Sequence, residues 1–193
     1  MSHEALAGHE VRVRHIADAD WDGITELEAR AYTRLGLSEG RAALESRMRA
    51  SPDTCFVLAA GPRIAGYLLA LPYPEHEYPD LHTKEAAGTA PISRNLHLHD
   101  VVIAEDLRHR GLARHLVGHL VETARARGYE RISLIAVGGS DTFWSARGFT
   151  ARADLAAPAG YGPGAVYMHR AVPGDVALAG ASPQTTHSRR EVG

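Results

Sequence analysis

Apolar and polar residues alternate at the start of the chain and then change to a helical spacing. Over residues 11–16, apolar side chains separated by charged ones predict a strand with one buried face. Asp18 and Asp20 are candidate N-caps for the helix that follows, whose apolar residues share one face. Ser38 is a candidate cap for a second, shorter helix that runs through Arg49. The chain therefore begins with a strand and two helices.

A hairpin and an unusually long connection come next. Two apolar runs, 54–60 and 63–71, flank the turn residues Gly61 and Pro62, which is typical of a β-hairpin. The segment 72–94 then holds four prolines and shows no sustained period. Because unstructured connections longer than about 12–15 residues are uncommon in compact domains, we expect this loop to have a function.

Strands and helices alternate in the second half of the chain. Apolar residues at helical spacing form the clearest helix of the sequence, which ends at Gly128. A nearly all-apolar run before the next turn predicts a strand covered on both faces. The expected elements are a strand over 96–103, a helix over 112–124, a strand over 131–137, a short helix around 140–147 and a last strand over 165–170.

This order of elements predicts one α/β domain around a single mixed sheet. A chain of 193 residues has room for one ordinary domain, and a hydrophobic fraction of 45% can fill its core. We expect the domain to span residues 10–172. Residues 1–9 and 173–193 show no apolar spacing, so we expect a flexible N-terminus and a flexible C-terminal tail.

Charge and cysteine content narrow the class of protein. Lys and Arg number 21 against 23 Asp and Glu, without a long block of one sign, so nucleic acid is not an expected partner. Cys55 is the only cysteine, which excludes an internal disulfide and fits a reducing compartment. No apolar run approaches the roughly 20 residues of a membrane-spanning helix, and Glu4 and Glu10 do not suit a secretory signal. We expect a soluble, cytoplasmic protein that does not bind membranes.

A basic segment with small residues, Arg108-His109-Arg110-Gly111-Leu112-Ala113, opens the clearest helix. A helix begins with unpaired backbone N–H groups and the positive end of its dipole, and small side chains let a phosphate approach them. The segment can therefore bind an anion, although spacing alone is equally compatible with a plain basic turn. A Walker loop is excluded, because no Lys and Ser or Thr follow Gly111.

This segment resembles the Arg/Gln-x-x-Gly-x-Gly/Ala motif with which GNAT N-acetyltransferases hold the pyrophosphate of coenzyme A. A second segment, Phe143-Trp144-Ser145-Ala146-Arg147-Gly148-Phe149, is similar to the family's aromatic pair followed by Gly-Phe. The resemblance implies the GNAT-like fold, with a mixed, mostly antiparallel sheet flanked by helices, and acetyl-CoA as co-substrate. It also implies that strands diverge beside the thioester and that the Val101 N–H stabilises the reacting oxygen. The residues implied in cofactor binding are Val101, Val102, Ile103, Arg108, His109, Arg110, Gly111, Leu112, Ala113 and Arg114.

Two histidines, His97 and His99, precede this motif at the separation seen in arylalkylamine N-acetyltransferases, where such a pair helps to deprotonate the amine. An alkylamine with a pKa of about 10.4 must lose a proton before it attacks, and an imidazole with a pKa of about 6.5 can accept it. Strand alternation places both histidines with Val101 and Ile103 on one face and Asp100 on the other, so we do not expect Asp100 to be their partner. Structural, hydrogen-bonded histidines are the alternative.

The sequence departs from the family pattern at Trp144, where a tyrosine often stands that is proposed to protonate the leaving thiolate. An indole N–H cannot serve as that acid. Tyr161 and Tyr167 are candidate replacements, although a thiol with a pKa of about 8.5 also leaves without help.

We therefore expect an enzyme that moves an acetyl group from acetyl-CoA to a primary amine by direct attack in a ternary complex. The acceptor is a small molecule or a protein amino group, and the resemblance makes a homodimer plausible. A non-catalytic acyl-CoA-binding module of the same fold is one alternative. A His-based metal hydrolase is another, but the histidine spacings do not complete a known zinc motif, so we expect no metal.

Overall fold

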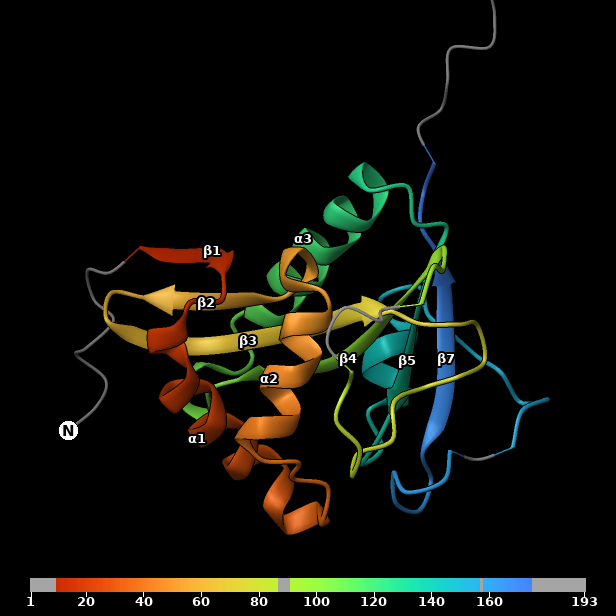
Figure 1. Cartoon of the computed structure of the whole chain (residues 1–193), viewed down its shortest axis with the longest axis horizontal. Coiled ribbons are helices and arrows are strands. Elements are labelled where there is room, and N and C mark those ends of the chain that lie inside the picture. Colours follow the sequence, from red (N-terminus) through yellow and green to blue (C-terminus); the bar gives the residue numbers. More distant parts are fainter. Residues whose placement is uncertain (1–9, 87–90, 157, 175–193) are drawn as a thin grey trace, which may run out of the picture.

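The computed structural model describes residues 10–86, 91–156 and 158–174 (Figure 1). Residues 1–9 and all but the first two residues of 173–193, predicted to be flexible, lie outside this description. The helices are α1 (Trp21–Tyr32), α2 (Arg41–Ala50), α3 (Leu112–Ala126) and α4 (Asp141–Ser145). The strands are β1 (Val11–His15), β2 (Phe56–Ala60), β3 (Arg63–Pro72), β4 (Asn95–Ile103), β5 (Arg131–Ala136), β6 (Thr150–Ala151) and β7 (Val166–Ala171).

In the described part of the chain the strands form one seven-stranded sheet in the order β1-β2-β3-β4-β5-β7-β6. Every neighbouring pair is antiparallel except β4 and β5, which run parallel. The mixed, mostly antiparallel sheet predicted from the sequence is therefore confirmed. Helices α1 and α2 lie across one face of the sheet and α3 lies behind it (Figure 1).

Apolar side chains bury both faces of the sheet. On the α3 face, Leu116 and Leu120 of the helix pack with Leu96 and Leu98 of β4. On the α1 face a smaller cluster joins helical and strand residues that include Trp21. Burial of apolar area on both sides is the main stabilisation of such a layered domain.

The predicted elements agree with the structure in most places, and the hairpin of β2 and β3 is confirmed. The prediction for Ser38 is wrong. Helix α2 begins at Arg41 after Gly40, and the Ser38 hydroxyl instead donates a hydrogen bond to Glu28 Oε2 at 2.8 Å. Glu28, a buried carboxylate on α1, accepts the hydrogen bond of the hydroxyl that was predicted to cap α2.

A β-bulge in β4 changes which side chains share a face. Leu69 of β3 is opposite Asp100 and Ala70 is opposite Leu98, so His99 is an extra residue without a partner on β3. Alternation therefore restarts after His99. Asp100 lies on the same face of the sheet as His97 and His99, toward α1 and α2.

The prediction that Asp100 faces away from the two histidines is consequently wrong, and so is the grouping of Val101 and Ile103 with them. Both of these residues pack into the core on the α3 face. A bulge has no local sequence signal here, because it depends on how β4 pairs with β3.

Strands β4 and β5 separate halfway along β4. They pair from Asn95 opposite Arg131 to Leu98 opposite Leu134, and the pairing then ends. Within the described residues, β4 from His99 to Ile103 has a strand neighbour only on its β3 side. The edge of β4 that faces β5 is therefore open in this part of the strand.

Residues 73–86 of the long loop are held at several points. The Tyr161 hydroxyl donates to Pro79 O at 2.6 Å, and Arg47 Nη2 donates to Asp80 O at 2.9 Å. The loop thus bridges α2 and the segment that precedes β7, and its Leu81 lines a cavity together with His99 of β4 and Ile135 of β5.

Candidate functional site

A cavity of about 280 Å³ lies where β4 and β5 separate. The end of α1, the open part of β4, the end of β5 and helix α4 each contribute to its wall. Its lining includes Tyr32, His99, Asp100, Val101, Val102, Ile103, Arg108, Ile135, Val137, Ser140, Phe143 and Trp144. We call it the strand-opening cavity.

The loop between β4 and α3 meets this cavity through Arg108, whose Nε donates to Ile103 O at 3.4 Å. His109 and Gly111 both have left-handed backbones, with φ of 64° and 79°, so the chain turns sharply into α3. Gly111 is the N-cap and supplies no side chain to the first N–H groups of the helix. Those groups suit the pyrophosphate of a coenzyme A thioester, so the local geometry fits such a ligand.

The other residues predicted to bind the cofactor are placed differently. Gly111 and Arg114 line a hollow of about 410 Å³ along α3. The side chains that line neither this hollow nor the strand-opening cavity are those of His109, Arg110, Leu112 and Ala113.

A second, smaller cavity of about 40 Å³ adjoins the first on the side of α2 and the long loop. Both cavities are lined by Tyr32, His99, Asp100, Ile135 and Val137. The smaller cavity adds Leu37, Glu39, Leu81 and Tyr161, so we call it the Glu39 cavity. His99 and Asp100 thus stand on the wall between two spaces, as two reacting molecules would require.

His99 has one partnered and one unpartnered ring nitrogen. Its Nε2 lies 2.5 Å from Oε1 of Glu39. Its Nδ1 is buried and has no hydrogen-bond partner among the described residues. Burial lowers the pKa of His99 below its ordinary value and outweighs the opposing effect of Glu39, so the imidazole is neutral at neutral pH.

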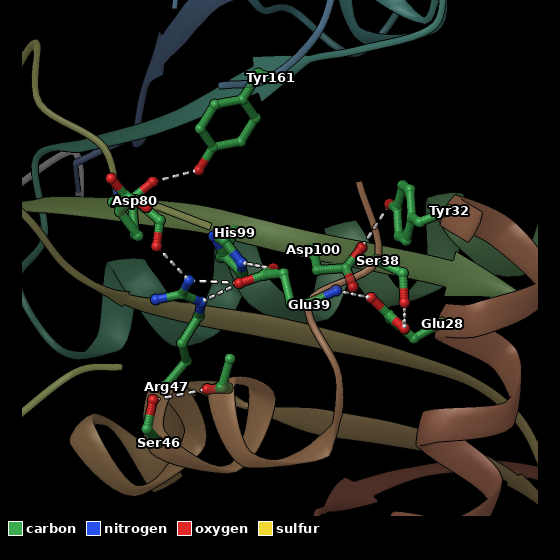
Figure 2. Close-up of polar contacts among 12 residues, drawn as sticks. Glu28, Tyr32, Ser38, Glu39, Ser46, Arg47, Asp80, His99, Asp100 and Tyr161 are labelled. Atoms are coloured by element: carbon green, nitrogen blue, oxygen red, sulfur yellow. Dashed lines mark hydrogen bonds and ion pairs between the residues drawn. The ribbon is translucent and has the colours of Figure 1, made fainter. Parts of the chain in front are cut away.

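Glu39 is held from both helices of this face (Figure 2). Arg47 of α2 donates to its Oε2 from Nε at 3.0 Å and also from Nη2. The backbone N–H of Glu39 donates to Oε1 of Glu28, on α1, at 2.6 Å. Burial would raise the pKa of Glu39, but His99 and Arg47 outweigh it and hold that pKa below its ordinary value.

Asp100 accepts hydrogen bonds from two tyrosine hydroxyls, Tyr32 at 2.6 Å and Tyr67. Burial raises the pKa of Asp100 to about 7, although both tyrosines act in the opposite direction. Sequence reasoning missed Asp100 and Glu39 as site residues. The available signal for Asp100 was a carboxylate within an apolar strand, and its meaning depended on the bulge.

His97 has a different environment from His99, although their ring centroids are 6.4 Å apart. It is 1% exposed, its Nδ1 lies 3.0 Å from Ser133 Oγ on β5, and it lines neither cavity. Burial lowers the pKa of His97 well below its ordinary value, and His99 and Arg47 add to this effect. The structure therefore brings only one of the two predicted histidines to the cavities.

The aromatic candidates are also separated. Tyr161 lines the Glu39 cavity, with its hydroxyl engaged at Pro79 O, and burial raises its pKa. Tyr167 on β7 lines neither cavity, and its hydroxyl accepts a bond from the His76 N–H at 3.0 Å. Trp144 lines the strand-opening cavity and packs edge-on against Phe149. The strand-opening cavity therefore receives no hydroxyl from Tyr161 or Tyr167, and Trp144 has none to offer.

The mixed sheet, flanked by helices and open between β4 and β5, agrees with a match to a protein family. The model of the Acetyltransferase (GNAT) family matches residues 21–149, which is more than half of the chain. The chain belongs to the GNAT acetyltransferase family. No curated protein matches the chain.

Solved structures with the same fold share little sequence with it. Ard1 from Thermoplasma volcanium is 16% identical with a TM-score of 0.62, covering 84% of this chain and 98% of Ard1. The GphF GNAT-like decarboxylase in complex with isobutyryl-CoA is 21% identical with a TM-score of 0.65, covering 84% of this chain and 100% of that one. N-acetylglutamate synthase from Neisseria gonorrhoeae, complexed with coenzyme A and N-acetyl-glutamate, is 15% identical with a TM-score of 0.64, covering 86% of this chain and 36% of that one.

No helix in the described ranges has both the length and the apolar character needed to cross a membrane.

Proposed function

We propose that this protein transfers an acetyl group from acetyl-CoA to a primary amine by direct attack in a ternary complex. The observation that carries the proposal is the position of His99, a neutral imidazole on the wall between the strand-opening cavity and the Glu39 cavity. The thioester belongs in the first cavity and the amine in the second.

The cofactor side is formed by the open part of β4 and the start of α3. Acetyl-CoA, when bound, supplies the acetyl thioester. Arg108 and the first N–H groups of α3 would hold its pyrophosphate. The open edge of β4 at Val101–Ile103 offers backbone groups for its arm and for the carbonyl oxygen.

The acceptor side supplies the proton acceptor. A primary amine with a pKa of about 10.4 arrives mostly as the ammonium ion and must be deprotonated before it attacks. His99 accepts that proton, and the neighbouring carboxyl of Asp100, when ionised, favours binding of the cation. The neutral amine nitrogen forms a bond to the acetyl carbon, the nitrogen releases its second proton to solvent, and the carbon–sulfur bond breaks, so that an amide and the coenzyme A thiolate result.

The leaving thiolate needs no acid from the chain. Trp144 occupies the position where the family resemblance places a tyrosine, and its indole cannot protonate sulfur. A thiol pKa of about 8.5 makes the thiolate a good leaving group, which solvent then protonates.

The test is an acceptor panel of small amines, polyamines, amino acids and peptides incubated with acetyl-CoA. Thiol release is measured with a thiol-reactive colorimetric reagent, and the acetylated product is identified by mass spectrometry. We expect amine-dependent thiol release that is strongly reduced in His99→Gln. Saturable acetyl-CoA binding without thiol release across the panel would instead identify a non-catalytic binding module. Thiol release that needs no amine would identify a hydrolase.

A further inference from the structure

Glu39 lies outside the motifs that identify the site, yet its carboxylate is buried and has partners at both oxygens. Its side chain is 6% exposed, and that of its partner Arg47 is 0% exposed. One carboxylate oxygen faces His99 and the other faces Arg47. Its backbone N–H is fixed by Glu28 on α1 (Figure 2).

Stability alone is a weak reason for this arrangement. Removing charges from water costs several kcal/mol per ion, and a buried ion pair commonly does no better than an apolar pair of the same volume. Here the side chains of Glu39 and Arg47 are buried beside one neutral imidazole, and Glu28 is buried against the backbone N–H of Glu39. What the arrangement does achieve is a single orientation of His99.

The hydrogen bond between Glu39 and His99 fixes the position of the imidazole proton. An ionised carboxylate can only accept, so Nε2 must carry the proton of the neutral ring. The lone pair is then on Nδ1, the atom that is buried and has no partner among the residues described. A base poised to take a proton requires this free lone pair.

Building on the proposed function, we propose that Glu39 is a positioning residue for His99. It holds the Nε2–H tautomer, leaves Nδ1 free to accept the proton of the amine, and stabilises the imidazolium that forms. Arg47 and Glu28 hold Glu39 in place from α2 and α1.

The charged and titratable groups around His99 determine the expected pH effect. They are Glu39 from the segment before α2, Arg47 from α2, Glu85 from the long loop, and His97 and Asp100 from β4. Glu39→Gln removes one negative charge and keeps the others, so the pKa of His99 must fall further, and the pKa of Asp100, which Glu39 raises, must fall with it. The acidic limb of the kcat/KM profile therefore moves to lower pH.

The first measurement uses the wild-type full chain and no acceptor. Nuclear magnetic resonance of protein labelled with ¹⁵N-histidine reads the protonation of each ring nitrogen, and His99→Gln identifies the resonances of His99. We expect a protonated Nε2 and an unprotonated Nδ1 at neutral pH. A proton on Nδ1 would overturn the proposal. Because this readout needs no turnover, it remains decisive even if the acceptor panel shows that the chain is not an acetyltransferase.

The second measurement compares Glu39→Gln with Glu45→Gln. Glu45 lies on α2 and is paired with Arg41 and Arg49 near the surface, so it undergoes the same chemical change outside the site. We expect Glu39→Gln to lower kcat about tenfold or more, to shift the acidic limb down by about one pH unit or more, and to leave the KM for acetyl-CoA unchanged. Glu45→Gln should behave as wild type. A Glu39→Gln protein that is folded by circular dichroism and has an unmoved acidic limb would overturn the proposal.

Discussion

Strand β4 has two parts with opposite properties, and the contrast between them explains the site. In the first part, Asn95–Leu98, both edges of the strand are paired, and His97 bonds to Ser133 of the neighbouring strand. In the second part, from His99 to Ile103, β5 has turned away, and the side chains on the α1 face meet two cavities. One histidine stands on each side of the boundary.

The comparison shows that strand pairing, rather than residue type, assigns the roles. Two histidines separated by one residue share a chemistry and a face of the sheet. One is bonded to β5, which supplies its partner, and the other lies on the wall of two cavities because of the bulge and the strand separation. Substitutions on either side of the boundary should therefore have separable effects.

The largest expected effect separates the two histidines directly. His99→Gln should lower kcat/KM for the amine by about 10²–10⁴-fold at neutral pH, because general-base assistance is worth that much. Raising the pH should partly restore the rate, since more of the amine arrives neutral. His97→Gln should retain kcat/KM within about threefold. Steady-state kinetics of both variants against pH provides the measurement.

Equal losses in the two variants would break the comparison, and they would support the original expectation that both histidines share the proton. The double variant is then informative, because a loss larger than the product of the single losses would indicate that each histidine substitutes for the other.

A second prediction extends the contrast to Asp100, which also lies in the open part. Asp100→Asn should lower kcat/KM about tenfold or more above neutral pH, because a hydrogen bond to a charged group is worth about 1.5–3 kcal/mol and the ammonium ion loses its carboxylate partner. The pKa of Asp100 is raised to about 7, so the difference from wild type should shrink as the pH falls through that value. Asp106→Asn, a change on the half-exposed partner of Arg63, is the matched control. A pH-independent ratio would argue that Asp100 only shapes the cavity.

A third prediction concerns the loop between β4 and α3, which follows the open part of β4. It compares the two ends of α3. Gly111 and Gly128 have nearly the same left-handed backbone, with φ of 79° and 76°. Valine at either position should cost about 1–2 kcal/mol of stability or more. Only Gly111→Val should also weaken acetyl-CoA binding, by about tenfold or more, because only Gly111 lies at the anion-binding end. Calorimetric titration and thermal unfolding of both variants measure these effects, and equal affinity in the two variants would place the pyrophosphate elsewhere.

Local patterns were sufficient to predict most of the fold. The alternation in the hairpin, the helical spacing that ends at Gly128 and the Gly111 turn all depend on residues close in sequence. The mixed sheet and the helices on its two faces follow from the order of these elements.

The site was less accessible to sequence reasoning, because its key features are long-range. The bulge at His99 is set by pairing with β3, and the Glu39–His99 contact joins residues 60 positions apart. The side chain of Ser38 shows the same limitation, since its choice of Glu28 over a helix cap depends on tertiary packing. Residue types identified the candidate chemistry, but only the three-dimensional pairing distinguished His99 from His97.

The smallest expected effect tests the paired part of β4 through the pH dependence of stability. Burial holds the pKa of His97 well below its ordinary value of about 6.5 in the folded protein. As the pH falls through about 6.5, the unfolded chain takes up a proton at this residue and the folded chain does not, so the wild type loses stability.

His97→Gln removes this loss. Titrating groups distant from His97 are common to both proteins and cancel in the comparison. Between about pH 7.5 and about pH 5.5, the free energy of unfolding should fall by about 1.4 kcal/mol more in the wild type than in the variant, as measured by urea unfolding. An identical pH dependence in the two proteins would mean that His97 is protonated inside the sheet, and the boundary between the two parts of β4 would then not separate the histidines by charge.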